Sequence, residues 1–296
     1  MTSMQDGIHY GVPFSEYQDW NAINQSTLKE GCRSMAHLLN AYIAKPVESK
    51  SFALGHAFHA AVLEPDRFDT EYVLEPEPGT YPPVADEWNA YREKNSDKGD
   101  DWCATNFKRT NAWKTAMSAF GISNVGKAKI TLQDLQTVKQ MKAALFANRT
   151  WQKISEDAEH TESSMLWHDT KNVLCKARLD MISPAGLIDL KTTEDASPKA
   201  FMRSIANYGY HFQAAFYQRG FNKITGKEVP VYFVVVEKTM PFGVAVYAMP
   251  WSAIMAGNEV IETLLAEYAD CLASDTWPGY LDAVQELDLP HWVVAA

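Results

Sequence analysis

The chain has 296 residues, of which 46% are hydrophobic and 22% are charged, as is usual for a folded globular protein. No apolar run reaches the roughly 18 residues that a transmembrane helix needs, and the N-terminus lacks the basic start and apolar stretch of a signal peptide, so we expect a cytoplasmic protein without membrane contact. The net charge of −10 excludes an all-over basic coat for nucleic acid, although a local basic channel can coexist with an acidic outer surface.

The first half of the chain has a helical pattern. Helices are predicted over residues 24–44, 52–63, 108–120 and 131–147. We expect Ser26 to cap the first of these helices and Thr131 to cap the last, with Asp134 well placed in its first turn. Residues 64–105 are rich in Pro, Glu, Asp and Gly, which predicts a long surface loop with short helical pieces.

Strands dominate the second half of the chain. They are predicted over residues 162–168, 173–182, 186–192, 229–237 and 243–249. Ser197 followed by Pro198 is a good helix opening, and this helix should extend to about residue 222. A closing helix is expected over residues 253–272. The order is therefore helices followed by βββαββα, in one large domain or in a core with an appended helical part.

The triplet Asp189-Leu190-Lys191 lies on the third predicted strand. Side chains alternate along a strand, so Asp189 and Lys191 should share a face, and the turn at residues 183–186 can bring Asp180 beside them. Two carboxylates and an ammonium group suit Mg²⁺ and a phosphate or water, which is the D…(D/E)xK arrangement of metal-dependent nucleases. Alternatively, such a triplet arises by chance and forms a weak surface ion pair. The apolar neighbours indicate central strands, where charges are costly unless they are paired or bound to metal, and this favours the first interpretation.

Three further groups could meet at this site. Glu162 could supply another carboxylate or could be a surface charge at a strand edge. His56 and His59 share a helix face at a spacing of three, and their pattern alone favours buried, hydrogen-bonded histidines. Gln213 and Tyr217 lie one helical turn apart, with Tyr210 on the same side. This polar stripe could contact DNA, orient Lys191, or be amphipathic surface.

The remaining signals are weaker. The candidate lining of a basic channel, or simply solvated surface, is Lys108, Arg109, Lys114, Lys199 and Arg203. Four scattered cysteines lack the spacing of a zinc or iron–sulfur site, so buried free thiols are expected. The sequence contains no Gly-rich phosphate loop, no GxSxG and no HExxH.

The sequence resembles the RecE-type, exonuclease VIII-like branch of the PD-(D/E)xK nuclease superfamily, which is common in phages and prophages. The resemblance covers nearly the whole chain. It is carried by the blocks NQSTL, FALGHAFHAAVLEPDRF, CKARLDMI, GLIDLKTTEDASPKAF and SIANYGYHFQAAFY. The order of the last three blocks is highly specific, whereas a lone DxK triplet would not be.

The resemblance implies roles for individual residues. Gly55 and His59 match a GxxxH motif, Asp180 matches the acidic residue that closes the second core strand, and Asp189 and Lys191 match the (D/E)xK pair. The residues that match the QxxxY helix motif and the glutamate preceding the first core strand are Gln213, Tyr217 and Glu162. The chain departs from the superfamily pattern at Leu179, which replaces a proline, and His56 matches no family role.

The implied fold is α/β, with a restriction-endonuclease-like core whose central mixed sheet is flanked by helices. Residues 1–150 would form an N-terminal helical region carrying the GxxxH motif, and residues 151–296 the nuclease core, packed together as one compact domain. Mg²⁺, replaceable by Mn²⁺, would be held by Asp180, Asp189, the Leu190 carbonyl and His59, while Lys191 would orient or deprotonate a water molecule or steady the phosphate. Lys199, Arg203, Gln213 and Tyr217 would contact the substrate.

The implied activity is digestion of one strand of linear double-stranded DNA from the 5′ end. The remaining 3′ tail would pass to a RecT-like annealing protein, and the enzyme would form a trimeric or tetrameric ring in the cytoplasm of a bacterial host. Such a ring needs only a basic lumen, which accommodates the net charge of −10. Alternatives are an inactive DNA-binding or recombination subunit with this fold, or an endonuclease of the same superfamily. A CRISPR-associated or helicase-linked nuclease fits less well, because many of those carry a four-cysteine iron–sulfur cluster.

Overall fold

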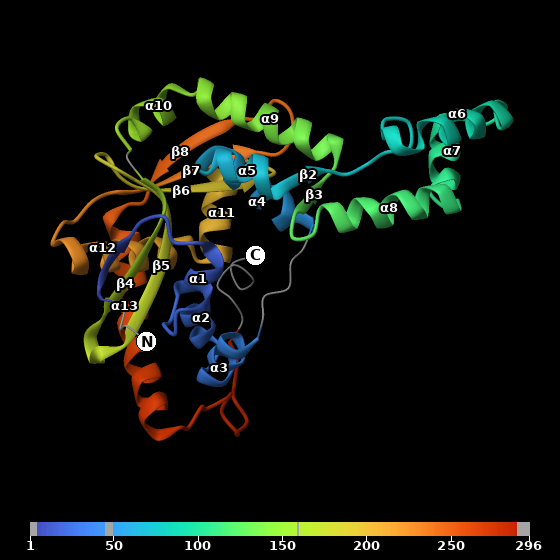
Figure 1. Cartoon of the computed structure of the whole chain (residues 1–296). Helices are drawn as coiled ribbons and strands as arrows, with labels where there is room; N and C mark the ends of the chain where they lie inside the picture. The colour runs from blue at the N-terminus through green and yellow to red at the C-terminus, as the bar shows by residue number, and fades with distance from the viewer. Residues whose placement is uncertain (1–4, 45–49, 159, 289–296) are drawn as a thin grey trace.

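A mixed sheet with helices on both faces forms the centre of the computed structural model, which describes residues 5–44, 50–158 and 160–288 (Figure 1). Its six strands lie in the order β1-β4-β5-β6-β7-β8. They are β1 Gly7–His9, β4 His160–His168, β5 Leu174–Ser183, β6 Gly186–Thr193, β7 Val231–Glu237 and β8 Val244–Ala248. Strands β6 and β7 pair in parallel and the other neighbours pair antiparallel. The expected α/β class with a central mixed sheet is therefore confirmed.

The alternation of side chains along the strands sends apolar residues to two separate cores. Leu187 and Phe233 belong to the core shared with α11, α12 and α13, whereas Ile188 and Val234 belong to the core shared with α4, α9 and α10. The bounds of these helices are α4 Lys50–Leu63, α9 Leu132–Ala147, α10 Arg149–Ser155, α11 Pro198–Tyr208, α12 Tyr210–Thr225 and α13 Trp251–Ser274. Within the described part of the chain, no helix combines the length and apolar character needed to cross a bilayer.

Two further helical groups flank this centre. The N-terminal helices are α1 Phe14–Asp19, α2 Gln25–Lys29 and α3 Met35–Ile43, with the 3₁₀ turn η1 Glu30–Cys32 between the last two. After α4 the chain forms α5 Pro65–Glu71, β2 Tyr72–Leu74, η2 Pro82–Val84, α6 Ala85–Lys94, α7 Asp100–Phe107, α8 Asn111–Ser123 and β3 Ala128–Ile130. A last 3₁₀ turn, η3 Thr170–Asn172, joins β4 to β5.

Helices α6, α7 and α8 project away from the sheet (Figure 1), and we call residues 75–127 the helical arm. The arm starts and ends at β2 and β3, which pair in parallel. It has its own apolar cluster, in which Phe107 and Trp113 are buried and Trp88 and Tyr91 pack against them. The short helical pieces predicted within residues 64–105 are confirmed as α5, α6 and α7, whereas the expectation that a long surface loop carries them was wrong, because α6 and α7 pack into the arm. Acidic residues in the first turns of α6 and α7 favour helix there, and the aromatic cluster supplies the packing.

Two predicted long helices are each divided. The segment predicted as one helix over residues 24–44 forms α2 and α3, because the Ser34 side chain accepts a hydrogen bond from the His37 N–H and starts a second helix. Asn24 caps α2 by accepting from the Thr27 N–H at 2.9 Å, so the prediction of Ser26 as the cap was wrong. The predicted helix from residue 198 to about residue 222 divides at Gly209, whose φ of 69° is left-handed.

The other predicted elements agree with the structure to within a few residues. Thr131 caps α9 by accepting from the Asp134 N–H at 3.0 Å, as expected. The second half has the predicted order of three strands, helix, two strands and helix, with the one helix divided into α11 and α12. The sequence pattern missed β1, α1, α10 and the short pair β2 and β3, since elements of three to seven residues carry too little periodicity to recognise.

The turn between β5 and β6 generates a test of the fold. Gly186 has a φ of 146°, and a Cβ there would lie 2.3 Å from the carbonyl oxygen of Pro230. We expect Gly186→Ala to lower the free energy of unfolding by about 2–4 kcal/mol in urea titrations, because it combines a strained backbone with a clash against the Pro230 carbonyl just before β7. Gly121→Ala in α8 meets no atom within 4 Å and should stabilise by up to about 1 kcal/mol. Equal tolerance of both substitutions would contradict this turn geometry.

Candidate metal centre

The candidate site lies where strands β5 and β6 separate. Strands β5 and β6 pair only near their shared turn, where Ser183 faces Gly186 and Met181 faces Ile188. Strand β6 continues to pair with β7 as far as Thr193. Asp180 is the next residue of β5, and its Oδ2 accepts a hydrogen bond from the Leu190 N–H at 2.7 Å. A carboxylate thus takes the place that a backbone carbonyl would have in a continuous ladder. This bond fixes Asp180 inside the fork between the strands.

Three groups that can bind a metal meet beside the fork. The ligand atoms of His59 on α4, Glu162 on β4 and Asp180 on β5 all lie within 4.8 Å of one another. His59 Nδ1 is 3.6 Å from Asp180 Oδ2. Glu162 is partly buried, with 17% of its side chain exposed, so the interpretation as a surface charge at a strand edge was wrong. We call His59, Glu162 and Asp180 the ligand trio.

The backbone at Glu162 is unusual. Its φ is 48°, in the left-handed region that residues other than glycine rarely occupy. The pairs Thr161–Met181 and Ser163–Leu179 flank it, which places Glu162 opposite Asp180 across β4 and β5. Strained conformations of this kind persist where the surrounding structure holds them, and they concentrate at functional sites.

Asp189 and Lys191 share one face of β6, as the alternation of the strand predicted. Lys191 Nζ forms an ion pair with Asp189 Oδ2 and lies 5.0 Å from the centre of the Tyr210 ring. Gln213 Nε2 donates to Asp189 Oδ1 at 2.7 Å and to the Tyr217 hydroxyl at 2.9 Å. Both side chains of this helix motif are buried, so the interpretation as amphipathic surface was wrong. Helix α12 therefore orients Asp189 through Gln213.

The ligand trio has a surplus of negative charge. Burial and the charge of Asp189 raise the pKa of Asp180 to about 7. Burial and the charge of Asp180 likewise raise the pKa of Glu162 to about 7, against the opposing effect of Arg178. Burial and the nearby Lys191 lower the pKa of His59, so its imidazole is neutral at neutral pH. Ionisation of these two carboxyl groups is disfavoured in the protein alone, and a bound cation would favour it. Together with the neutral imidazole, the ionised groups form a donor set that suits a divalent cation such as Mg²⁺ or Mn²⁺.

Lys191 has the opposite electrostatic balance. Burial disfavours its ammonium group, but the carboxylates of Asp189 and Asp180 outweigh this effect and raise the pKa of Lys191. The side chain therefore keeps its proton at neutral pH. In this state Lys191 can donate hydrogen bonds to an anionic group, such as a phosphate, and cannot accept a proton from water.

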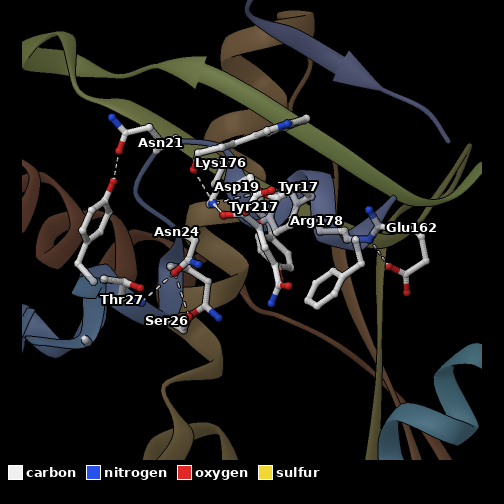
Figure 2. A pocket seen from close by; sticks show the side chains of 18 of the residues that line it. Tyr17, Asp19, Asn21, Asn24, Ser26, Thr27, Glu162, Lys176, Arg178 and Tyr217 are labelled. Carbon is white, nitrogen blue, oxygen red and sulfur yellow. Dashed lines mark hydrogen bonds and ion pairs between the residues drawn. The ribbon is translucent and has the colours of Figure 1, made fainter. Parts of the chain in front are cut away.

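A cleft of about 1040 Å³ is lined by two members of the ligand trio, Glu162 and Asp180. Asn24, Ser26 and Thr27 lie at one end of the cleft, and Glu162 and Arg178 lie at the other (Figure 2). The chain segments that form its walls are residues 17–27, the end of α3, and β5. His56 is exposed and lines this cleft, so the prediction of a buried histidine was wrong at this position.

The predicted basic channel is not assembled around this cleft. Lys199 and Arg203 are exposed on α11, and Lys108, Arg109 and Lys114 are exposed on the helical arm, where Lys108 pairs with Glu77 at 2.7 Å. The cations that do line the cleft are Lys176 and Arg178. Sequence reasoning missed both, although they precede Asp180 at spacings of four and two on the same strand and so share its face.

The cysteine prediction was confirmed for three of the four residues. Cys103, Cys175 and Cys271 are buried free thiols, whereas Cys32 is exposed on the turn between α2 and α3. No cysteine belongs to the ligand trio, in agreement with a centre built from carboxylates and imidazole.

Comparison with known proteins places these features in context. The sequence matches a family described as a PDDEXK-like domain of unknown function (DUF3799) over residues 24–289. The fold is similar to the crystal structure of a candidate exonuclease from Eubacterium rectale, with a TM-score of 0.58 over 97% of this chain and 99% of that chain. The two chains are 12% identical, so this likeness establishes a shared fold only. No curated protein matches the sequence.

The raised pKa of Asp180 generates a test of the ligand trio. A carboxyl with a folded-state pKa of about 7 and an unfolded value of about 3.9 binds more protons when folded, so its contribution to stability falls as the pH rises between those values. In EDTA, Asp180→Asn should therefore raise the melting temperature at pH 8, and the gain should shrink towards pH 5. Asp282→Asn, at an exposed position, is the control. A gain that does not depend on pH would contradict the proposed charge balance.

Proposed function

Because the chain belongs to the PDDEXK-like family DUF3799, we propose that it is a metal-dependent DNA nuclease. The observation that carries this proposal is the convergence of the ligand trio with Asp189 and Lys191 at the fork between β5 and β6. Within that class we propose a RecE-type exodeoxyribonuclease, which hydrolyses phosphodiester bonds from the 5′ end of linear double-stranded DNA and leaves 3′ single-stranded tails.

The side chains divide into ligands and positioning groups. Asp180, Asp189, the Leu190 carbonyl, His59 and Glu162 would hold Mg²⁺, or Mn²⁺ in its place. Such an ion, when bound, makes a coordinated water more acidic and offsets the charge that develops on the phosphate. Lys191, which keeps its proton, would steady the scissile phosphate. Gln213 would keep Asp189 in place through its bond to Oδ1, and it would do so from the interior of the protein.

The size of the cleft supports an attack on one strand at a time. Pockets for small ligands have volumes of about 300–1,000 Å³, so a cleft of about 1040 Å³ has room for a few nucleotides of one strand. We propose that a duplex separates before its backbone reaches the ligand trio. This requirement favours attack at an end of the DNA, where strands separate most readily, over attack within an intact duplex.

The partners follow from the same proposal. With a net charge of −10 and exposed cations on separate elements, a single chain has little to attract duplex DNA electrostatically. We propose that a trimeric or tetrameric ring of identical chains gathers such cations around a lumen and holds linear DNA there. The resulting 3′ tails would be received by a RecT-like annealing protein.

Substitution of Asp189 and Lys191 on β6 tests the proposed chemistry. Asp189→Ala and Lys191→Ala should each reduce Mg²⁺-dependent degradation of linear duplex by at least about 100-fold, because each removes a group proposed to contact the metal or the phosphate. Circular dichroism should show an unchanged fold. Asp282→Ala and Lys227→Ala, at exposed positions outside the site, should retain full activity. Vigorous degradation by either β6 variant would rule out the assignment.

End-labelled DNA tests the direction of digestion and separates the alternatives. With Mg²⁺, a 5′ label on linear duplex should be released early, while a 3′ label should remain on long single strands. EDTA should stop the reaction, and covalently closed circles should resist it. Equal digestion of circles and linear DNA would instead identify an endonuclease. Binding of DNA and Mn²⁺ without any cleavage would identify an inactive subunit with a nuclease fold.

A further inference from the structure

Arg178 is the cation nearest to the ligand trio on β5. It precedes Asp180 by two residues, so the two side chains lie on the same face of the strand. Only 9% of the Arg178 side chain is exposed. A guanidinium group this deeply buried is costly unless its donors are satisfied, so its partners reveal what holds it there.

The guanidinium group joins the metal centre to the N-terminal segment. Arg178 Nε donates to Glu162 Oε2 at 2.6 Å. Its Nη1 donates to the Val12 carbonyl at 2.8 Å and to Ser164 Oγ at 3.2 Å. The guanidinium carbon also lies 5.8 Å from the centre of the Phe14 ring. These contacts fix the direction of the guanidinium plane, and the plane in turn fixes the carboxylate of Glu162.

Glu162 requires such a partner. The register of β4 against β5 places Glu162 opposite Asp180, where two neighbouring carboxylates repel each other when both are ionised. Without an opposing cation, the Glu162 carboxylate would turn away from Asp180 towards water. Arg178 opposes this repulsion, because its guanidinium group holds Glu162 Oε2 at 2.6 Å from Nε.

We propose that Arg178 is a positioning residue, which holds the Glu162 carboxylate within reach of His59 and Asp180 for metal binding. The proposal rests on the metal centre proposed above. It also makes the N-terminal segment part of that centre, because the Val12 carbonyl and the Phe14 ring hold the guanidinium group from the other side. Partners that orient metal ligands in this way commonly contribute about 10- to 100-fold to metal affinity.

The test is calorimetric titration of the full-length protein with Mn²⁺. Arg178→Met should weaken Mn²⁺ binding by about 10- to 100-fold. Arg178→Lys keeps the charge but loses the planar fork, so its affinity should lie between those of the wild type and Arg178→Met. The matched control is Arg219→Met. Arg219 is also a partly buried arginine, and it pairs with the carboxylates of Asp169 and Glu262. This variant should lose stability and keep wild-type Mn²⁺ affinity.

A double-mutant comparison separates positioning from general destabilisation. In a Glu162→Gln background, Arg178→Met should cause no further loss of Mn²⁺ affinity if Arg178 acts through Glu162. Wild-type or tighter Mn²⁺ binding by Arg178→Met would overturn the proposal. So would a loss of Mn²⁺ affinity on adding Arg178→Met to Glu162→Gln that is as large as the loss in the wild-type background. If Arg178→Met fails to fold, the Arg178→Lys variant decides, because wild-type Mn²⁺ affinity of Arg178→Lys would also overturn the proposal. Failure of the wild type to bind Mn²⁺ would refute the metal centre itself, which is a distinguishable outcome.

Discussion

The hydrogen bond from the Leu190 N–H to Asp180 is the interaction on which the candidate centre depends. Where β5 leaves β6, the buried N–H of Leu190 needs an acceptor, and an unsatisfied donor there would cost about 1–3 kcal/mol. The acceptor is a carboxylate, so the fold and the site share one contact. Because the neighbouring residues of β6 are Asp189 and Lys191, the same fork brings all three charged side chains of the D…DxK pattern together.

The charges around the fork are only partly balanced. Lys191 pairs with Asp189, and Arg178 pairs with Glu162, while Asp180 has a backbone donor and a neutral imidazole beside it. The raised pKa values of Asp180 and Glu162 show that ionising these carboxyls opposes folding. A cation bound at the ligand trio would reverse this effect. Ionised Asp180 and Glu162 therefore lower the stability of the fold unless a cation balances their charge.

Sequence periodicity was sufficient for part of this site. Side chains alternate along a strand, so Asp189 and Lys191 share one face wherever β6 lies in the sheet. An N-cap such as Thr131 can also be predicted, because it depends only on atoms nearby in the sequence. The pairing of Glu162 with Arg178 could not be predicted, because it depends on the register of β4 against β5 and on a left-handed backbone. The divisions at Ser34 and Gly209 were missed because apolar spacing continues across both.

The helical arm has a consequence for the dynamics of the protein. Its aromatic cluster is separate from both cores of the main sheet, and its base is a pair of three-residue strands. A unit that contributes little to the packing of the rest can open without disturbing it. Amide hydrogens in α6, α7 and α8 should therefore exchange with solvent through local opening, at a lower free energy than those of β5, β6 and β7. The helical arm and the candidate metal centre would therefore open to solvent at different free energies within one chain.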